Sequence, residues 1–238
     1  MKKLTNQNLQ AYYARIAGLS YIIFTLAGLI KNFVLNTQLS DVGAAHTQGI
    51  FENELQFRLG SAAEIVMFLG VVMASVSFYI VFKSVSKQLA QTALCLRLIE
   101  IITGGMAVVI GMGMLALTNS TYLQNTVDME QLHAIVIIAS SFRLPAYEYS
   151  WIPMGFAGVI TFYLFFKTRY IPRFWSVWGM ITYTSLIIYP LARLLIVDLP
   201  REAMFVLFPG ALFELGVGIW LLIKGVNNQS TVNEISSH

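Results

Sequence analysis

Six long apolar runs constrain the fold of this chain more than any other feature of its sequence. They lie near residues 12–35, 59–82, 89–117, 146–166, 174–197 and 203–223. Each run reaches the length of about 20 residues that a helix needs to cross a bilayer. Backbone groups in lipid must be satisfied within their own segment, so runs of this kind fold as helices. The sequence therefore predicts an all-α fold, an integral membrane bundle of six helices.

The composition agrees with this class. Of 238 residues, 57% are hydrophobic and 11% are charged, and the mean hydropathy is +0.68. Soluble chains carry about 25% charged residues. The net charge of +3 would suit nucleic acid only if the basic residues formed a patch, and they are scattered at the ends of apolar runs. We therefore expect a lipid bilayer and no nucleic acid as the partner.

One transmembrane helical domain is predicted over residues 1–226. Residues 227–238 are polar and are expected to form a disordered cytoplasmic tail. At the other end, Lys2 and Lys3 precede the first apolar run, but a polar stretch separates them from it and no Ala-x-Ala motif follows the run. We therefore interpret the first run as a retained anchor.

The basic residues predict the orientation in the membrane. With the N-terminus inside, nine fall at inner helix ends and four at outer ends. The inner set is Lys2, Lys3, Arg15, Lys83, Lys87, Lys167, Arg169, Arg173 and Lys224, and the outer set is Lys31, Arg58, Arg143 and Arg201. Cytoplasmic loops carry an excess of Lys and Arg, so this distribution favours cytoplasmic termini.

Two outer segments separate the predicted spans. Residues 36–57 form the longest polar connection, which includes His46 and is placed to cover the outer mouth of the bundle. Residues 128–142 have an apolar centre at 132–139 that is too short to span a bilayer. We predict a short outer interfacial or re-entrant helix there, which leads into span four through Pro145.

Six charged residues lie within the predicted spans: Glu64, Arg97, Glu100, Glu148, Arg193 and Glu214. A charge at the centre of a membrane helix costs about 2.5 to 3.5 kcal/mol on insertion scales, so such residues normally face the protein interior and often mark function. Arg97 and Glu100 are three residues apart, so they share one helix face and can pair. Because Arg97 stays protonated, we predict a main partner from another helix, Glu64 or Glu214, with Glu100 assisting.

Span five adds polar side chains to this core. Thr182, Ser185, Tyr189 and Arg193 share one face of the helix, and Pro190 is expected to interrupt it. These residues can line a polar cavity that opens to the outside, together with Tyr147, Tyr149 and Trp151 near Glu148. The alternative is a set of hydrogen bonds between helices without a cavity, each worth about 0.6 kcal/mol.

Spans two and four share a sequence pattern. Residues 77–83 and 161–167 are similar, and at the same offset Glu64 falls on Glu148. A parallel repeat of a helical hairpin would explain this similarity. Aromatic residues followed by lysine are also what the inner end of any membrane helix selects, so both interpretations stay open.

Metal and cofactor sites have little support in the sequence. His46, His133 and His238 are scattered outside the apolar runs, and Cys95 is the only cysteine. Neither a His-x-x-x-His nor a Cys-x-x-Cys spacing occurs. We therefore predict no metal, no cofactor and no intrachain disulfide, and we disfavour a hydrolase with a histidine-activated nucleophile.

Five short motifs together resemble a known family. They are residues 14–19 (ARIAGL), residues 57–60 (FRLG) before Glu64, residues 96–98 (LRL), residues 171–173 (IPR) and residues 214–226, which run from Glu214 to WLLIKGV. In order and spacing they are similar to the bacterial membrane family called domain of unknown function 4386, in which Asp stands as often as Glu at the position of Glu64. This resemblance implies a multi-helix protein of the bacterial cytoplasmic membrane and no established activity.

Three hypotheses for function follow from these features. The first is a protein that binds or transports a small or amphipathic molecule in an outward-facing polar cavity. An intramembrane enzyme that uses Glu64 and Glu148 as acid and base is the less favoured second, and a non-catalytic interaction or immunity-type protein is the third. The predicted ligand-binding residues are Glu64, Arg97, Glu100, Glu148, Tyr189, Arg193 and Glu214. The sequence does not specify the oligomeric state.

Overall fold

The computed structural model describes residues 6–35, 53–196 and 198–227, and within these residues every element is a helix. Helix α1 (Asn6–Leu29) continues as a π-helix, η1 (Ile30–Val34). The elements that follow are α3 (Glu54–Phe82), α4 (Lys87–Thr118), α5 (Thr121–Thr126), α6 (Met129–Tyr149), α7 (Trp151–Thr168), α8 (Arg173–Leu195), the 3-10 helix η2 (Arg201–Leu207) and α9 (Phe208–Lys224). The predicted all-α class is confirmed. Residues 228–238 of the expected tail, and His46 with most of its loop, lie outside the described residues.

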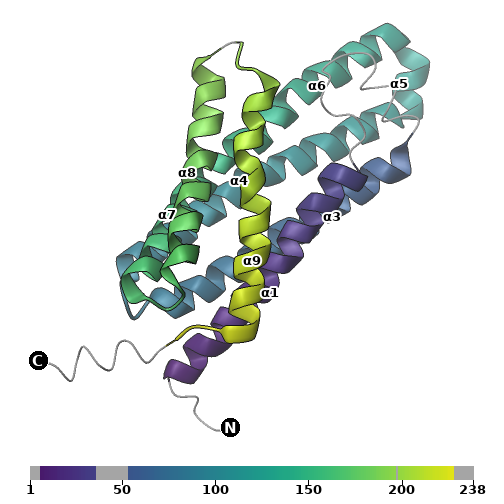
Figure 1. Ribbon diagram of the computed structural model, residues 1–238. Helices are drawn as coiled ribbons and strands as arrows, with labels where there is room; N and C mark the ends of the chain where they lie inside the picture. Colours follow the sequence, from purple (N-terminus) through teal and green to yellow (C-terminus); the bar gives the residue numbers. More distant parts are fainter. Residues whose placement is uncertain (1–5, 36–52, 197, 228–238) are drawn as a thin grey trace, which may run out of the picture.

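Within the described residues, five helical segments are long and apolar enough to cross a membrane: Asn8–Val34, Glu54–Phe82, Lys87–Thr118, Glu130–Thr168 and Glu202–Lys224. The protein is therefore a multi-pass membrane protein. The remaining predicted span, 174–197, corresponds to α8, which is 23 residues long but carries several polar side chains. In Figure 1, α8 runs lengthwise in the bundle, packed against α7 and in contact with α9.

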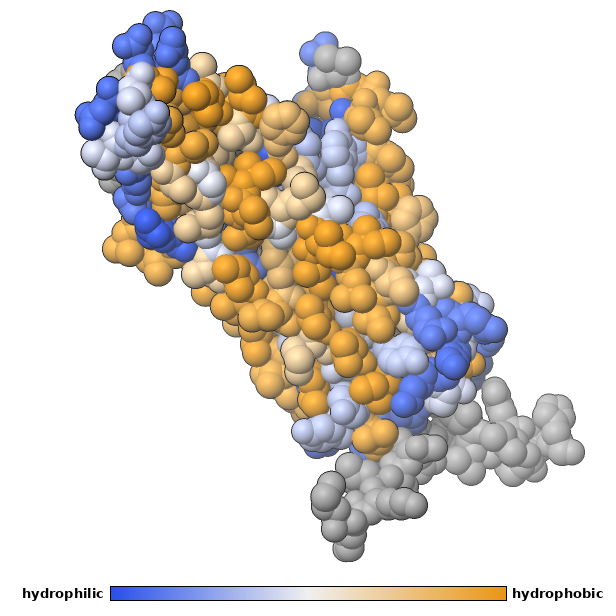
Figure 2. Space-filling model, turned by 180° about the vertical axis from the view of Figure 1, so that it is seen from behind, coloured by the Kyte–Doolittle hydropathy of each residue, from blue (hydrophilic) through white to orange (hydrophobic). Residues whose placement is uncertain are grey.

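The helices form a bundle that opens at one end (Figure 1). Helix α1 begins and helix α9 ends at the same end of the bundle, which we call the terminal end, and the opposite end is the distal end. Towards the distal end, α4, α5 and α6 lean away from α8 and α9. Figure 2 shows the two arms from behind, separated by a notch, with a broad hydrophobic surface between hydrophilic ends. Such a band is what lipid contact requires.

Residues 128–142 do not form the separate short helix that was predicted. They are the first part of α6, which continues through Pro145 to Tyr149 and leads directly into α7 at Ser150. The buried side chains of Leu132 and Val136 explain the difference, because they bury the apolar centre within the protein, and α6 packs along α4. Helix α4 has 32 residues, or about 48 Å at 1.5 Å per residue. That length exceeds the roughly 30 Å thickness of the hydrocarbon layer, and tilting can accommodate a helix of this length.

Aromatic rings fill the terminal half of the bundle. Phe78 and Phe82 of α3 contact Phe165 of α7 edge to face, with ring centroids 5.5 and 4.7 Å apart. Phe162 contacts Phe213 of α9 at 4.9 Å in the same way. Edge-to-face pairs of this kind add about 0.5 to 1.5 kcal/mol beyond their buried area. This part of the molecule is a packed apolar core, and the charged side chains described below lie on its distal side.

Close contact between α7 and α8 depends on Gly158. A β-carbon at this position would collide with the ring of Tyr183, which is completely buried. Small residues allow membrane helices to approach in this way. The same contact fixes the Tyr183 side chain, whose hydroxyl belongs to the polar centre of the bundle.

We predict that Gly158→Ala lowers the stability of the protein by about 1 to 3 kcal/mol, the usual cost of overpacking a core. The measurement is thermal unfolding of purified protein in detergent. Gly105→Ala in α4 is the matched control, because no atom lies within 4 Å of its added β-carbon. It should leave the midpoint unchanged or raise it slightly, since alanine favours a helix by about 1 kcal/mol over glycine. Equal effects of the two changes would contradict the proposed helix contact.

Candidate functional site

An ion pair between Arg97 and Glu100 occupies the middle of α4. Arg97 Nη1 lies 2.9 Å from Glu100 Oε2, and the two residues are 7% and 4% exposed. The guanidinium carbon is also 5.2 Å from the centroid of the Tyr183 ring. Our prediction that the main partner comes from another helix was wrong, because Glu100 of the same helix bonds directly to Arg97. Glu64 is bound elsewhere, and Glu214 acts on Arg97 only over a longer distance.

Glu214 of α9 joins this pair through hydroxyl groups. Its Oε1 accepts a hydrogen bond from the Tyr183 hydroxyl, and its Oε2 accepts one from Thr25 Oγ1, both at 3.1 Å. The hydroxyls of Tyr21 and Tyr183 are 2.9 Å apart. We call Tyr21, Thr25, Arg97, Glu100, Tyr183 and Glu214 the central cluster. It links α1, α4, α8 and α9, and it contains two carboxylates and one guanidinium.

A second group, the distal cluster, surrounds Glu64 and consists of Lys31, Glu64 and Arg143. Lys31 Nζ lies 2.8 Å from Glu64 Oε1, and Arg143 Nη2 lies 3.5 Å from Glu64 Oε2. Arg143 Nε also donates to the backbone carbonyl of Ala107 at 3.1 Å. All three side chains are buried. The distal cluster joins η1, α3 and α6, and it has two cations against one acid.

Sequence reasoning had assigned Lys31 and Arg143 to the outer surface. The structure instead buries both against Glu64. The sequence does contain a signal for the burial of Lys31, because this residue lies inside the apolar run 12–35. Lys31 is carried by the π-helix η1, a rare geometry that is frequent at functional sites. Its Nζ lies 4.3 Å from the centroid of the Tyr147 ring.

The remaining predicted site residues lie near the distal end of α7 and α8. Arg193 Nη1 is 3.4 Å from Glu148 Oε1, and the Arg193 side chain is 38% exposed. Tyr189 is buried, with its ring 6.1 Å from that of Trp151. Pro190 does not interrupt α8, which continues to Leu195. Because proline has no amide hydrogen, it still leaves the carbonyl of Leu186 without its usual helical donor.

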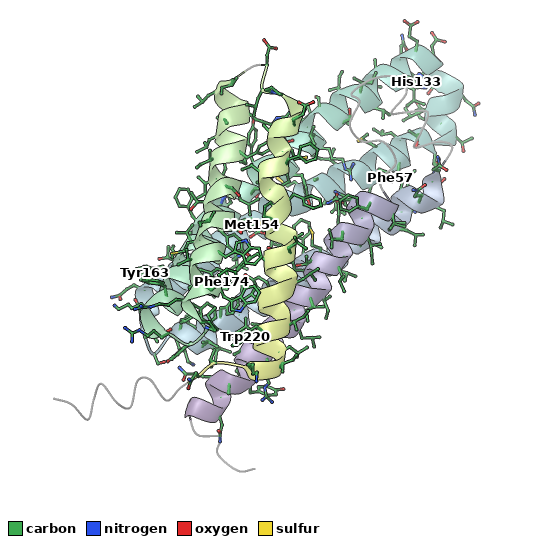
Figure 3. All side chains as sticks on the ribbon, in the orientation of Figure 1. Phe57, His133, Met154, Tyr163, Phe174 and Trp220 are labelled. Atoms are coloured by element: carbon green, nitrogen blue, oxygen red, sulfur yellow. The ribbon has the colours of Figure 1, made fainter. Side chains whose placement is uncertain are left out.

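A cavity of about 190 Å³ lies between the central cluster and the distal end. Its walls come from α1 and η1, α3, α4, the α6–α7 junction, α8, η2 and α9. Most of the wall is apolar, and its polar side chains are Thr25, Asn32, Glu100, Tyr147, Ser150, Trp151, Thr182, Ser185 and Glu214. In Figure 3, Met154, which lines the cavity, lies about midway along the bundle, between Phe57 and Trp220. An engineered cavity of about 150 Å³ holds benzene, so this one has room for a small organic molecule.

The structure thus brings together only part of the predicted site. Glu100 and Glu214 line the cavity, and Arg97 lies behind Glu100. Glu64, Glu148, Tyr189 and Arg193 do not line it, and the three charged residues among them are engaged in other ion pairs. Sequence reasoning missed Tyr21, Thr25 and Tyr183, because a hydroxyl in an apolar run gives no signal until its partner helix is known.

A much smaller cavity, of about 10 Å³, lies on the terminal side of the ion pair. That is about the space that a single water needs. Arg97 lines this small cavity together with Ser75 and Thr161, whereas Glu100 lines the large one. The Arg97–Glu100 pair therefore forms part of the wall between the two spaces.

We predict that Arg97 is energetically coupled to Glu100 and not to Glu64. Arg97→Met strands a buried carboxylate and should cost about 3 to 5 kcal/mol, and part of this loss should return in Arg97→Met/Glu100→Met. Thermal unfolding of the single and double variants in detergent measures the coupling. Arg97→Met with Glu64→Gln is the control, and its effects should add, because the two residues bind different partners. Additivity in the Glu100 pair would contradict the assignment.

The comparisons with known proteins identify a family but no function. The family model described as Domain of unknown function (DUF4386) matches residues 16–225. No curated protein and no solved structure matches the chain. The match covers most of the sequence, so the chain belongs to the DUF4386 family.

Proposed function

We propose that this DUF4386 protein binds a small amphipathic molecule in the cavity on the distal side of the central cluster. The observation that carries this proposal is the cavity itself, with a volume of about 190 Å³ and two carboxylates in a mostly apolar wall. Small-molecule sites have this composition, an apolar lining with a few polar groups that orient the ligand. Charged residues that served folding alone would not require a cavity of this size beside them.

The arrangement of the wall indicates how such a molecule lies. Phe24, Leu29, Met67 and Val71 offer an apolar surface from α1 and α3. Glu100, Glu214, Thr25, Thr182 and Ser185 offer oxygen atoms from α4, α9, α1 and α8. A ligand with an apolar body and one polar group satisfies both surfaces. A fully polar ligand would leave the apolar wall in contact with its charges, which costs free energy.

We propose that both termini face the cytoplasm and that the cavity faces the outside of a bacterial cytoplasmic membrane. The exposed basic residues at the terminal end support this orientation: Lys83, Lys87, Lys167, Arg169, Arg173 and Lys224. At the distal end, Lys31 and Arg143 neutralise Glu64 and are buried. With those two removed from the outer count, the excess of inner basic residues is larger than the sequence alone indicated.

Transport is a second candidate function, which the small cavity favours. The Arg97–Glu100 pair stands between a large distal space and a small terminal space, and an intramembrane barrier of charged residues is common on substrate pathways. The enzyme hypothesis has weaker support. Glu64 is held by Lys31 and Arg143 and Glu148 is held by Arg193, so these two acids do not face one common space.

We predict that Ala211→Phe blocks ligand binding. Ala211 lines the cavity, and the added ring would occupy much of its volume. The probes are three molecules of matched size: benzyltrimethylammonium, its neutral isostere neopentylbenzene and the anion phenylmethanesulfonate. Ligand-observed NMR with protein in nanodiscs should detect binding of at least one of them. Ala211→Phe should weaken that binding by about tenfold or more.

Ala62→Phe is the matched control for this experiment, since Ala62 is exposed on α3 and does not line the cavity. It corrects for partition of the probes into lipid and for any general effect of an added ring. Thermal unfolding of both variants shows whether they are folded. The binding function is refuted if none of the three probes binds wild-type protein above the empty nanodisc.

The topology has its own test. Reporter fusions after Lys87, Asp128 and Lys224 should read inside, outside and inside respectively. These positions lie at the start of α4, at the tip of the α4–α6 arm and at the end of α9. A reporter that is active on the outer side after Lys224 would reverse the orientation, and with it the side to which the cavity opens.

A further inference from the structure

We propose that the polar group recognised in the cavity is a cation, an ammonium carried by an amphipathic molecule. This inference rests on the proposed binding function and specifies its substrate class. It starts from a charge imbalance in the central cluster, where Glu100 and Glu214 carry two acidic groups and Arg97 is the one base. Both carboxylates line the cavity, and the guanidinium does not. Among the residues that the structure describes, the charged side chains in the cavity wall are therefore both acidic.

Arg97 is not free to neutralise both acids. It is bonded to Glu100 at 2.9 Å, and its guanidinium lies against the Tyr183 ring. Glu214 receives hydrogen bonds from two neutral hydroxyls, those of Thr25 and Tyr183. In the part of the chain that the structure describes, no lysine or arginine forms an ion pair with Glu214.

The distal cluster has one more cation than acid, but that cation is not a counterion for Glu214. Lys31 and Arg143 are bonded to Glu64, and neither lines the cavity. Tyr147 does line it, and Lys31 Nζ lies 4.3 Å from the centroid of that ring. A ligand in the cavity therefore contacts Tyr147, whereas the amine of Lys31 is not part of the cavity wall.

A buried carboxylate without a counterion must take up a proton or attract a cation. An ammonium group on a bound molecule can supply that cation for Glu214, which lines the cavity. Tyr147, Trp151, Phe24 and Phe68 add aromatic surface to the same wall. Aromatic faces attract quaternary ammonium groups, so the wall favours a cation twice, by charge and by cation–π contact. An anion would meet two carboxylates and be repelled.

The test compares the same three probes on wild-type protein in nanodiscs of zwitterionic lipid. Benzyltrimethylammonium should bind about tenfold or more tightly than neopentylbenzene, which has the same shape without the charge, and phenylmethanesulfonate should not bind. Acidifying the assay should weaken binding of the cation, because protons compete for the carboxylate, and should leave the neutral probe unaffected.

Glu214→Gln should lower the affinity for the cation to about that for the neutral isostere and leave the affinity for the neutral isostere unchanged. Glu202→Gln is the matched control, because Glu202 is an exposed acid of η2 that does not line the cavity. Equal binding of cation and neutral isostere by wild-type protein, or a preference for the anion, overturns the inference and leaves the binding function standing. The absence of binding by all three probes refutes both. The comparison of the three probes on wild-type protein needs no variant, so it tests the preference for a cation even if Glu214→Gln does not fold.

Discussion

The ion pair between Arg97 and Glu100 is the interaction on which the centre of the bundle depends. A guanidinium cannot lose its proton at ordinary pH, and a charge far from water is costly unless it is paired. Glu100 supplies the pair at 2.9 Å, and the Tyr183 ring covers the other side of the guanidinium. Gly158 in turn makes room for that ring. The charged side chain of Arg97 on α4 is thus accommodated by contacts from its own helix, α8 and α7.

Charge and apolar packing divide the molecule along its length. Phenylalanine rings from α3, α7 and α9 fill the terminal half, and the two polar clusters occupy the middle and the distal half. Towards the distal end the α4–α6 arm diverges from α8 and α9 (Figure 1). The cavity lies on the polar side of this division, with Thr25, Glu100 and Glu214 of the central cluster in its wall.

Several features of the site were accessible from residue spacing and several were not. The spacing of three residues placed Arg97 and Glu100 on one helix face, so that they could pair, but the prediction of a main partner from another helix was wrong. The partners of Glu64 come from α6 and from the π-helix after α1, so no spacing in the sequence connects them. The hydroxyl donors to Glu214 likewise come from α1 and α8. The same limit applies to Arg143, which the sequence predicts at an outer helix end and the structure buries against Glu64.

The sequence by itself determined the all-α membrane class, the approximate positions of the spans and the identity of most intramembrane charges. These follow from hydrophobic length and backbone hydrogen bonding, which are properties of single segments. Only the tertiary structure decided which charges pair, that residues 128–142 extend into a long helix packed on α4, and that Glu100 and Glu214 face one cavity. Those outcomes depend on how separate helices rotate and tilt against one another, because the free energy of a buried charge is set by the groups that surround it in space.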